Sequence, residues 1–126
     1  MIEDIKKKLR RWEASRNFEE SDRVPVLISV GAPFFCQIFG YTLKDFYRNL
    51  DLNLRIQVEG SKWAYSNLGD DRIEYKKDVT QVTPNIGAIG EGIVWNCEIR
   101  LPTDDNPWLS PWIVPKFTTP EEIEKI

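Results

Sequence analysis

The sequence predicts an α/β fold that does not close within its 126 residues. Three observations predict it: a helical pattern at residues 2–16, an apolar run at 24–30, and a helix start at 119–126. Alternation of helices and strands is typical of α/β folds. In the last segment Thr119 can cap a helix and Glu122 completes a capping box, but only about two turns follow. We therefore expect a single partial domain, the front portion of a larger fold. A short terminal helix that simply docks is the alternative.

The first two elements follow from the spacing of apolar residues. Ile2, Ile5, Leu9 and Trp12 recur at helical spacing with charges between them, which predicts an amphipathic helix over residues 2–16. Residues 24–30 are almost all β-branched or aliphatic, as in a strand of a parallel sheet that is buried on both faces. We therefore predict the first strand there.

Residues 33–67 are predicted to be helical. Pro33 starts a short apolar helix that Gly40 ends, and Thr42 with Asp45 caps the next one. Residues 51–67 fit two patterns, because apolar and polar residues alternate as in a strand while others form a helical stripe. We predict a helix, since no turn residue interrupts the segment before residue 69.

Extended segments and loops are expected over residues 72–117. Residues 72–79 and 93–101 read as extended, and the glycine-rich loop at 83–92 lies between them. Residues 102–115 form a loop that large aromatic contacts would stabilise.

Composition excludes several function classes. With 17 basic and 20 acidic residues, the net charge of -3 does not indicate a nucleic-acid binder. The sequence shows no secretory signal and no apolar stretch long enough for a membrane span, so we expect no membrane partner and a cytoplasmic location.

The chain also lacks the residues of several common reaction centres. Histidine is absent, so Ser-His-Asp and Cys-His nucleophilic schemes cannot form within it. Cys36 and Cys97 lack metal-ligand spacing, and we expect them to be buried small hydrophobes. Five tryptophans are many for a partial domain, and those left exposed would favour association.

Several segments occur in an order that is known from one superfamily. They are residues 23–28 leading into 31–35, then 40–47, 90–92, 97–98, and 107–112 before 119–122. In this order they resemble the uroporphyrinogen decarboxylase-like superfamily, which includes porphyrinogen decarboxylases and corrinoid- or cobalamin-dependent methyltransferases. The resemblance covers nearly the whole chain.

The resemblance implies the N-terminal part of a (β/α)8 TIM-type barrel, about the opening third. In such barrels the chemistry lies at the C-terminal ends of the strands. No catalytic residue is assigned within this chain. The candidate pocket-lining residues are Ser29, Gly31, Pro33, Phe34, Asn85, Gly87, Glu91 and Trp95.

Departures from the family pattern indicate which branch of the superfamily, decarboxylase or methyltransferase, the chain resembles more. True decarboxylases carry two arginines after the first strand, where this chain has Ser29 and Pro33. They also carry an aspartate for the pyrrole N–H groups, where this chain offers Asn85 or Gly87. The chain therefore resembles the corrinoid methyltransferase branch more closely. Zinc and a corrinoid are implied only for a full-length relative, and this chain is expected to hold no metal or cofactor itself.

Three functional hypotheses stay open. The chain is an N-terminal fragment of a methyltransferase-like enzyme that is inactive alone, with a carboxy-lyase of tetrapyrrole biosynthesis as the alternative. Or it is a small binding module in which residues 87–92 approach an anion through backbone N–H groups, although the loop lacks a known phosphate-binding order. Or it is a non-catalytic assembly module that pairs with another polypeptide, either the missing C-terminal barrel portion or further copies of itself.

Overall fold

The protein is described here by a computed structural model, which covers residues 2–116 and residue 119. The predicted helix at 119–126 therefore lies, except for Thr119, outside the described residues. In chain order the elements are α1 (Ile2–Asn17), α2 (Ala32–Phe39), α3 (Leu43–Arg48), α4 (Leu50–Asn67), the 3-10 turns η1 (Val79–Gln81) and η2 (Gly87–Ile89), α5 (Gly90–Val94), β1 (Glu98–Arg100) and β2 (Trp112–Val114).

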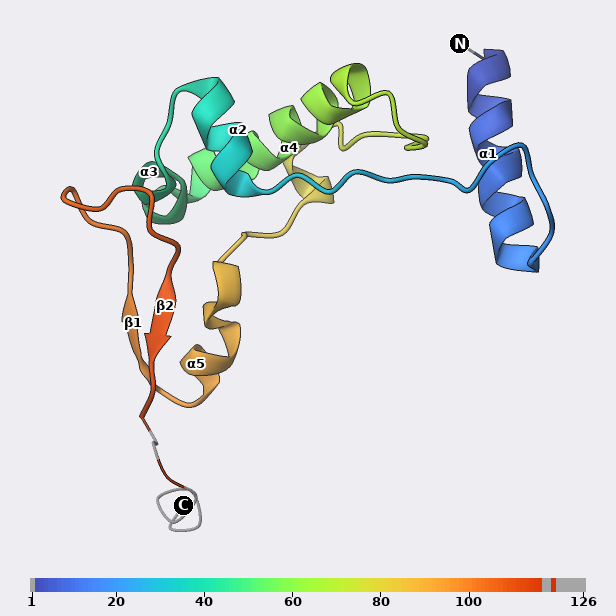
Figure 1. The fold of residues 1–126 in the computed structure, drawn as a ribbon. Coiled ribbons are helices and arrows are strands. Elements are labelled where there is room, and N and C mark those ends of the chain that lie inside the picture. The colour runs from blue at the N-terminus through green and yellow to red at the C-terminus, as the bar shows by residue number, and fades with distance from the viewer. Residues whose placement is uncertain (1, 117–118, 120–126) are drawn as a thin grey trace.

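Helix α1 stands apart from the other helices, and the extended residues between it and α2 cross the gap (Figure 1). Acidic Glu3 and Asp4 in its first turn and Arg16 in its last turn complement the helix dipole. The indole Nε1 of Trp12 donates to the backbone oxygen of Asp71 at 2.9 Å. Helix α1 is thereby tied to the loop that follows α4.

Helices α2, α3 and α4 pack around the core of the protein. Gly40 ends α2 in the left-handed region, at φ 77°, as the sequence predicted. The predicted capping box of α3 is also present: Thr42 accepts the N–H of Asp45, whose carboxylate accepts the N–H of Thr42. The buried core residues are Phe35, Cys36, Leu43, Phe46, Leu52, Ile56 and Ala64.

Helix α4 covers the segment in which strand and helix patterns competed. The side chain of Asn49 caps it by accepting the N–H of Leu52 at 3.0 Å. Asn53 is one of the polar residues in the alternating apolar and polar pattern, yet it is buried. Its amide donates to the backbone oxygens of Phe46 and Asn85. The alternation therefore reflects a buried polar residue on a helix and not the two faces of a strand.

A thin arm extends from the helices (Figure 1). The glycine-rich segment that was predicted to be a loop forms η2 and α5, so helix continues to Val94 within the segment predicted to be extended. Strands β1 and β2 then pair antiparallel, with Glu98 opposite Val114 and Arg100 opposite Trp112. Gly92 allows this hairpin to pack on α5, because a Cβ there would lie 2.6 Å from Ile113.

The prediction that this chain forms the opening part of a TIM-type barrel is wrong. Among the described residues the only strand pair is the antiparallel hairpin β1–β2, and no parallel pair is present. Residues 24–30 run extended but pair with no strand in the part of the chain that the structure describes. A strand needs neighbours as well as β propensity, and on one edge of this segment side chains of residues 70–72 occupy the backbone groups that a neighbouring strand would use.

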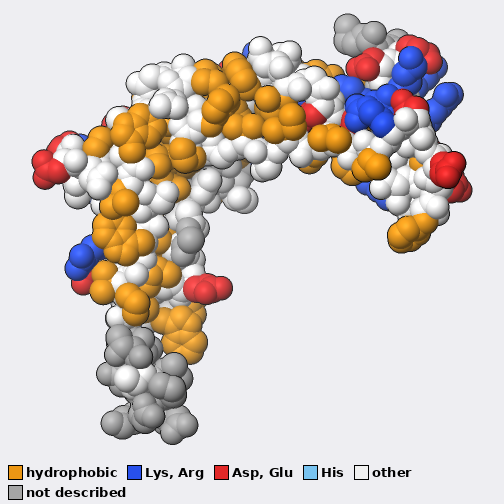
Figure 2. Space-filling view, in the orientation of Figure 1, with side chains coloured by type: hydrophobic (Ala, Val, Ile, Leu, Met, Phe, Trp, Pro, Cys, Tyr) orange, Lys and Arg blue, Asp and Glu red, His pale blue; other side chains and the backbone are white. Residues whose placement is uncertain are grey.

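The chain exposes more surface than a compact protein of its mass. Its accessible surface is 9279 Å², whereas a compact monomer of 14.7 kDa exposes about 6,900 Å². The molecule curves into an arch, and apolar side chains lie along its visible face (Figure 2). Within the described part, none of the helices is both long enough and apolar enough to cross a membrane.

Candidate functional site

The extended segment 24–30 is held along one edge by the loop after α4. The backbone N–H of Val26 donates to the Asp71 carboxylate at 2.8 Å, and the N–H of Asp71 returns a bond of 2.8 Å to the oxygen of Val26. The N–H of Ile28 donates to the Asp70 carboxylate at 2.9 Å, and Arg72 Nη2 donates to the oxygen of Ile28 at 2.8 Å. We call this edge, formed by even-numbered residues, the sealed edge.

The opposite edge of the same segment is open. In an extended chain the backbone groups of successive residues point to opposite sides. The N–H and C=O groups of Leu27 and Ser29 accordingly face away from residues 70–72, and they make no hydrogen bond within the described part of the chain. Pro25 adds an acceptor to this edge but has no N–H. We call it the free edge.

Aliphatic side chains flank the free edge on both faces of the segment. Val24 is 77% exposed and Leu27 is 58% exposed, and Val26 and Ile28 are also exposed. Such residues are normally buried in a sheet, and here four of them are exposed within five positions.

Buried charges hold the sealed edge in place. Asp71 is fully buried, and its carboxylate pairs with Arg11 Nη1 at 2.8 Å and with Arg23 Nη1 at 2.5 Å. Burial alone would raise the pKa of Asp71, but the bonds from Val26, Arg11 and Arg23 outweigh it and hold this pKa below its ordinary value.

The neighbouring carboxylate is held in the same way. The Arg72 guanidinium lies 2.7 Å from Asp70, and its hydrogen bonds hold the pKa of Asp70 far below the ordinary range. Both carboxylates therefore stay ionised near neutral pH, so the sealed edge is occupied by charges that are already paired.

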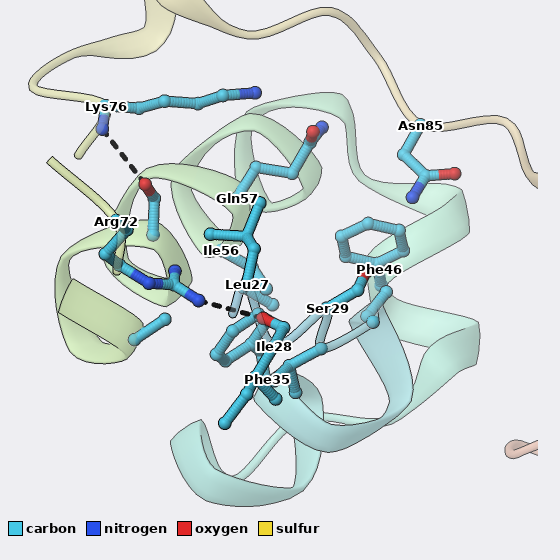
Figure 3. Close-up of a pocket in the computed structure, with 15 residues that line it drawn as sticks. Leu27, Ile28, Ser29, Phe35, Phe46, Ile56, Gln57, Arg72, Lys76 and Asn85 are labelled. Atoms are coloured by element: carbon cyan, nitrogen blue, oxygen red, sulfur yellow. Dashed lines mark hydrogen bonds between the residues drawn. The ribbon is translucent and has the colours of Figure 1, made fainter. Parts of the chain in front are cut away.

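A cavity of about 500 Å³, which we call the bowl, opens beside the segment. Figure 3 draws the residues that line it. Residues 27–32 form one wall, and its apolar floor includes Phe35, Phe46 and Ile56. Polar groups lie around the opening: Ser29, Gln57, Ser61, Arg72, Lys76 and Asn85. Figure 3 shows Arg72 turned inward to the backbone of Ile28.

The predicted pocket residues fall into two groups. Ser29, Gly31 and Asn85 line the bowl. The other five lie elsewhere: Pro33 and Phe34 in the first turn of α2, Gly87 beside the hydroxyl of Tyr47, Glu91 in α5, and Trp95 just after α5. Phe34 packs edge-on against Trp63, with ring centroids 5.3 Å apart, and Trp95 is 56% exposed.

The groups that hold the segment, and the basic groups at the bowl, were not predicted from the sequence. Asp70, Asp71 and Arg72 form a charged run directly after Gly69, and Lys76 follows four residues later. A charged run between a helix and a predicted strand was the available signal. Its partners lie more than 40 residues earlier in the chain, and spacing alone does not reveal them.

The donor set does not fit the zinc implied for a full-length methyltransferase. Over the described residues, no three His, Cys, Asp or Glu side chains gather where they could hold a metal ion. Cys36 lies in the apolar core, where burial and, to a smaller extent, the Asp45 carboxylate raise its thiol pKa to about 11. This thiol would be protonated near neutral pH, unlike a metal-bound thiolate.

Comparison with known proteins gave no family, no curated protein and no solved structure that matches the chain. The geometry of the extended segment and the bowl therefore provides the basis for a functional proposal.

Proposed function

We propose that the chain is a non-catalytic assembly module, which accepts a β-strand of a further polypeptide along the free edge of residues 24–30. The observation that carries the proposal is the free edge itself. It presents unpaired backbone groups at Leu27 and Ser29 between exposed aliphatic side chains. A strand added to such an edge gains main-chain hydrogen bonds and buries side chains on both faces.

The sealed edge prepares the segment for this role. Asp70, Asp71 and Arg72 already hold residues 26 and 28 in an extended conformation. A partner would therefore not have to order this part of the chain, and preorganisation of this kind improves affinity. The bowl is lined by residues 27–32 and has an apolar floor, so it can receive apolar side chains of a polypeptide that binds along this segment.

The surface area of the chain supports association as well. Its exposed area exceeds that of a compact monomer of the same mass by about 2,300 Å². A standard stable interface covers about 800 Å² on each partner. Covering the free edge and the bowl would remove part of this excess.

A direct test is binding of a synthetic strand. The probe is a short valine- and isoleucine-rich peptide with flanking lysines and a fluorescent label, followed by anisotropy. Leu27→Pro removes the outward N–H and leaves Val26 and Ile28 able to bond to the sealed edge. We expect at least a tenfold weaker affinity for this variant.

Leu27→Ala is the matched control, because it keeps the N–H and shortens only the side chain. We expect a loss of only a few-fold, and unchanged helix content by circular dichroism in both variants. The titration uses a concentration at which light scattering shows the chain to be monomeric, because a second copy on the free edge would compete with the peptide. The proposal is wrong if the monomeric original chain does not bind the peptide, or if Leu27→Pro binds it equally well.

A second candidate is the function implied by the resemblance, a portion of a methyltransferase-like or decarboxylase-like enzyme. It is favoured by the fact that Ser29, Gly31 and Asn85 line one bowl. Calorimetric titration with methylcobalamin and with a porphyrinogen tests it. Binding that Ser29→Trp abolishes would support this candidate, and no heat with either compound would count against it. The proposed location is the cytoplasm for either candidate function.

A further inference from the structure

The free edge has a pattern of donors and acceptors that complements itself. Pro25 offers only an acceptor, whereas Leu27 and Ser29 each offer a donor and an acceptor. We propose that this edge pairs antiparallel with the same edge of a second copy, so that Leu27 faces Leu27 across a two-fold axis. The inference rests on the proposed assembly function and specifies its partner.

Hydrogen bonding selects this alignment. In an antiparallel pair, directly opposed residues of the bonded type exchange both N–H···O bonds. The two Leu27 residues would satisfy each other, and each Ser29 N–H would donate to the oxygen of Pro25 in the other copy. Because Pro25 has no N–H, only the Ser29 oxygens stay without a donor from the other strand. They lie at the ends of the pairing, where water can reach them.

The side chains also fit a second copy. A strand added here would be flanked by aliphatic groups on both faces, so it should itself be apolar on both faces. Within the described chain, residues 24–30 have this character, with no charged side chain among them. Self-pairing therefore brings no like charges opposite each other, and the two-fold arrangement is the commonest one for homo-oligomers.

The area needed for such a dimer is present. A standard interface requires about 800 Å² from each copy, and each copy exposes about 2,300 Å² beyond a compact monomer of its mass. A symmetric contact of standard size would remove part of this excess.

Engineered cysteines test both the partner and the register. Leu27→Cys and Val24→Cys are each made in a chain that carries Cys97→Ser, while Cys36 stays because it is buried. In the proposed pairing the two residues 27 have Cα atoms about 5.5 Å apart, within disulfide range. The two residues 24 are then about 20 Å apart, since each position along the strand adds about 3.4 Å.

We expect mild oxidation to convert most of the Leu27→Cys chain to a covalent dimer on a non-reducing gel, and little of the Val24→Cys chain. Val24 is the more exposed of the two positions, so random collision would favour the opposite result. Light scattering on the original chain should give twice 14.7 kDa at the same concentration.

Three results would overturn the inference. Equal cross-linking at both positions indicates random collision or a parallel pairing. A dimer by light scattering that Leu27→Cys does not trap indicates a different interface. A chain that stays monomeric yet binds the synthetic strand supports the assembly function but excludes a second copy as the partner. A chain that stays monomeric and does not bind the synthetic strand excludes both the second copy and the assembly function.

Discussion

Asp71 binds both backbone groups of Val26: its carboxylate accepts the N–H of Val26 and its own N–H donates to the oxygen of Val26, each at 2.8 Å. These two residues lie 45 positions apart in the sequence. The same carboxylate binds Arg11 of α1 and Arg23. One buried aspartate therefore joins α1, the extended segment and the loop after α4.

Replacing Asp71 with alanine should destabilise the protein by about 3 kcal/mol, because removing one member of a buried charge cluster leaves its partners uncompensated. Urea unfolding followed by tryptophan fluorescence measures the change. Asp104→Ala is the control, since Asp104 is exposed and pairs only with Lys44 at the surface. It should change stability by less than about 0.5 kcal/mol. Equal effects of the two substitutions would show that Asp71 does not hold the fold.

Acid should unfold the protein through the aspartates of the sealed edge. The pKa values of Asp70 and Asp71 are both lowered in the folded state, below the ordinary 3.8. Such groups contribute stability above their unfolded pKa, and that stability is lost as pH falls through the folded pKa. We expect the free energy of unfolding to decrease below about pH 4. Asp70→Asn should flatten this decrease, and an unchanged slope would contradict the assignment.

Gly60→Ala should destabilise the helical core by about 1 to 3 kcal/mol. A Cβ at residue 60 of α4 would lie 2.7 Å from the ring of Phe35, which packs directly on this glycine. Gly90→Ala is the matched control, because its nearest neighbour would be 3.7 Å away and its φ of -56° suits alanine. It should be neutral or raise stability by up to about 1 kcal/mol. Thermal unfolding of both variants gives the comparison.

The two cysteines should differ strongly in reactivity. Burial raises the thiol pKa of Cys36 to about 11, whereas Cys97 is only half-buried. With iodoacetamide at pH 8, Cys97 should be alkylated first and Cys36 only when urea unfolds the chain. Peptide mass spectrometry identifies the labelled residue. Fast labelling of Cys36 in the folded chain would show that the core around α2 opens readily.

Local signals in the sequence predicted local structure well. Gly40 ends α2, and Thr42 with Asp45 caps α3, because each of these features depends on residues within a few positions. The predicted burial of Cys36 is also confirmed, since it lies in the middle of an apolar helix. The same prediction is wrong for Cys97, which is only half-buried because it lies in the thin arm, between α5 and β1.

Long-range relationships were not predictable in the same way. The apolar run at 24–30 carries the composition of a sheet strand, but the composition does not tell which groups pair with its backbone. Here Asp70 and Asp71 provide those groups from more than 40 residues away. The position of Asn85 at the bowl likewise depends on the buried Asn53, which accepts its N–H at 2.9 Å. Asn53 lies in the middle of a predicted helix, and the sequence pattern there does not indicate its contact with Asn85.

The sealed edge has a consequence for behaviour at high concentration. An exposed apolar strand with two open sides can act as a template on which molecule after molecule stacks into a fibril. In this chain ionised side chains already fill one side of residues 24–30, so only one further strand can be added to this segment. Strand addition along this segment would then stop at a dimer. The aspartates that order the segment would therefore also limit aggregation through it.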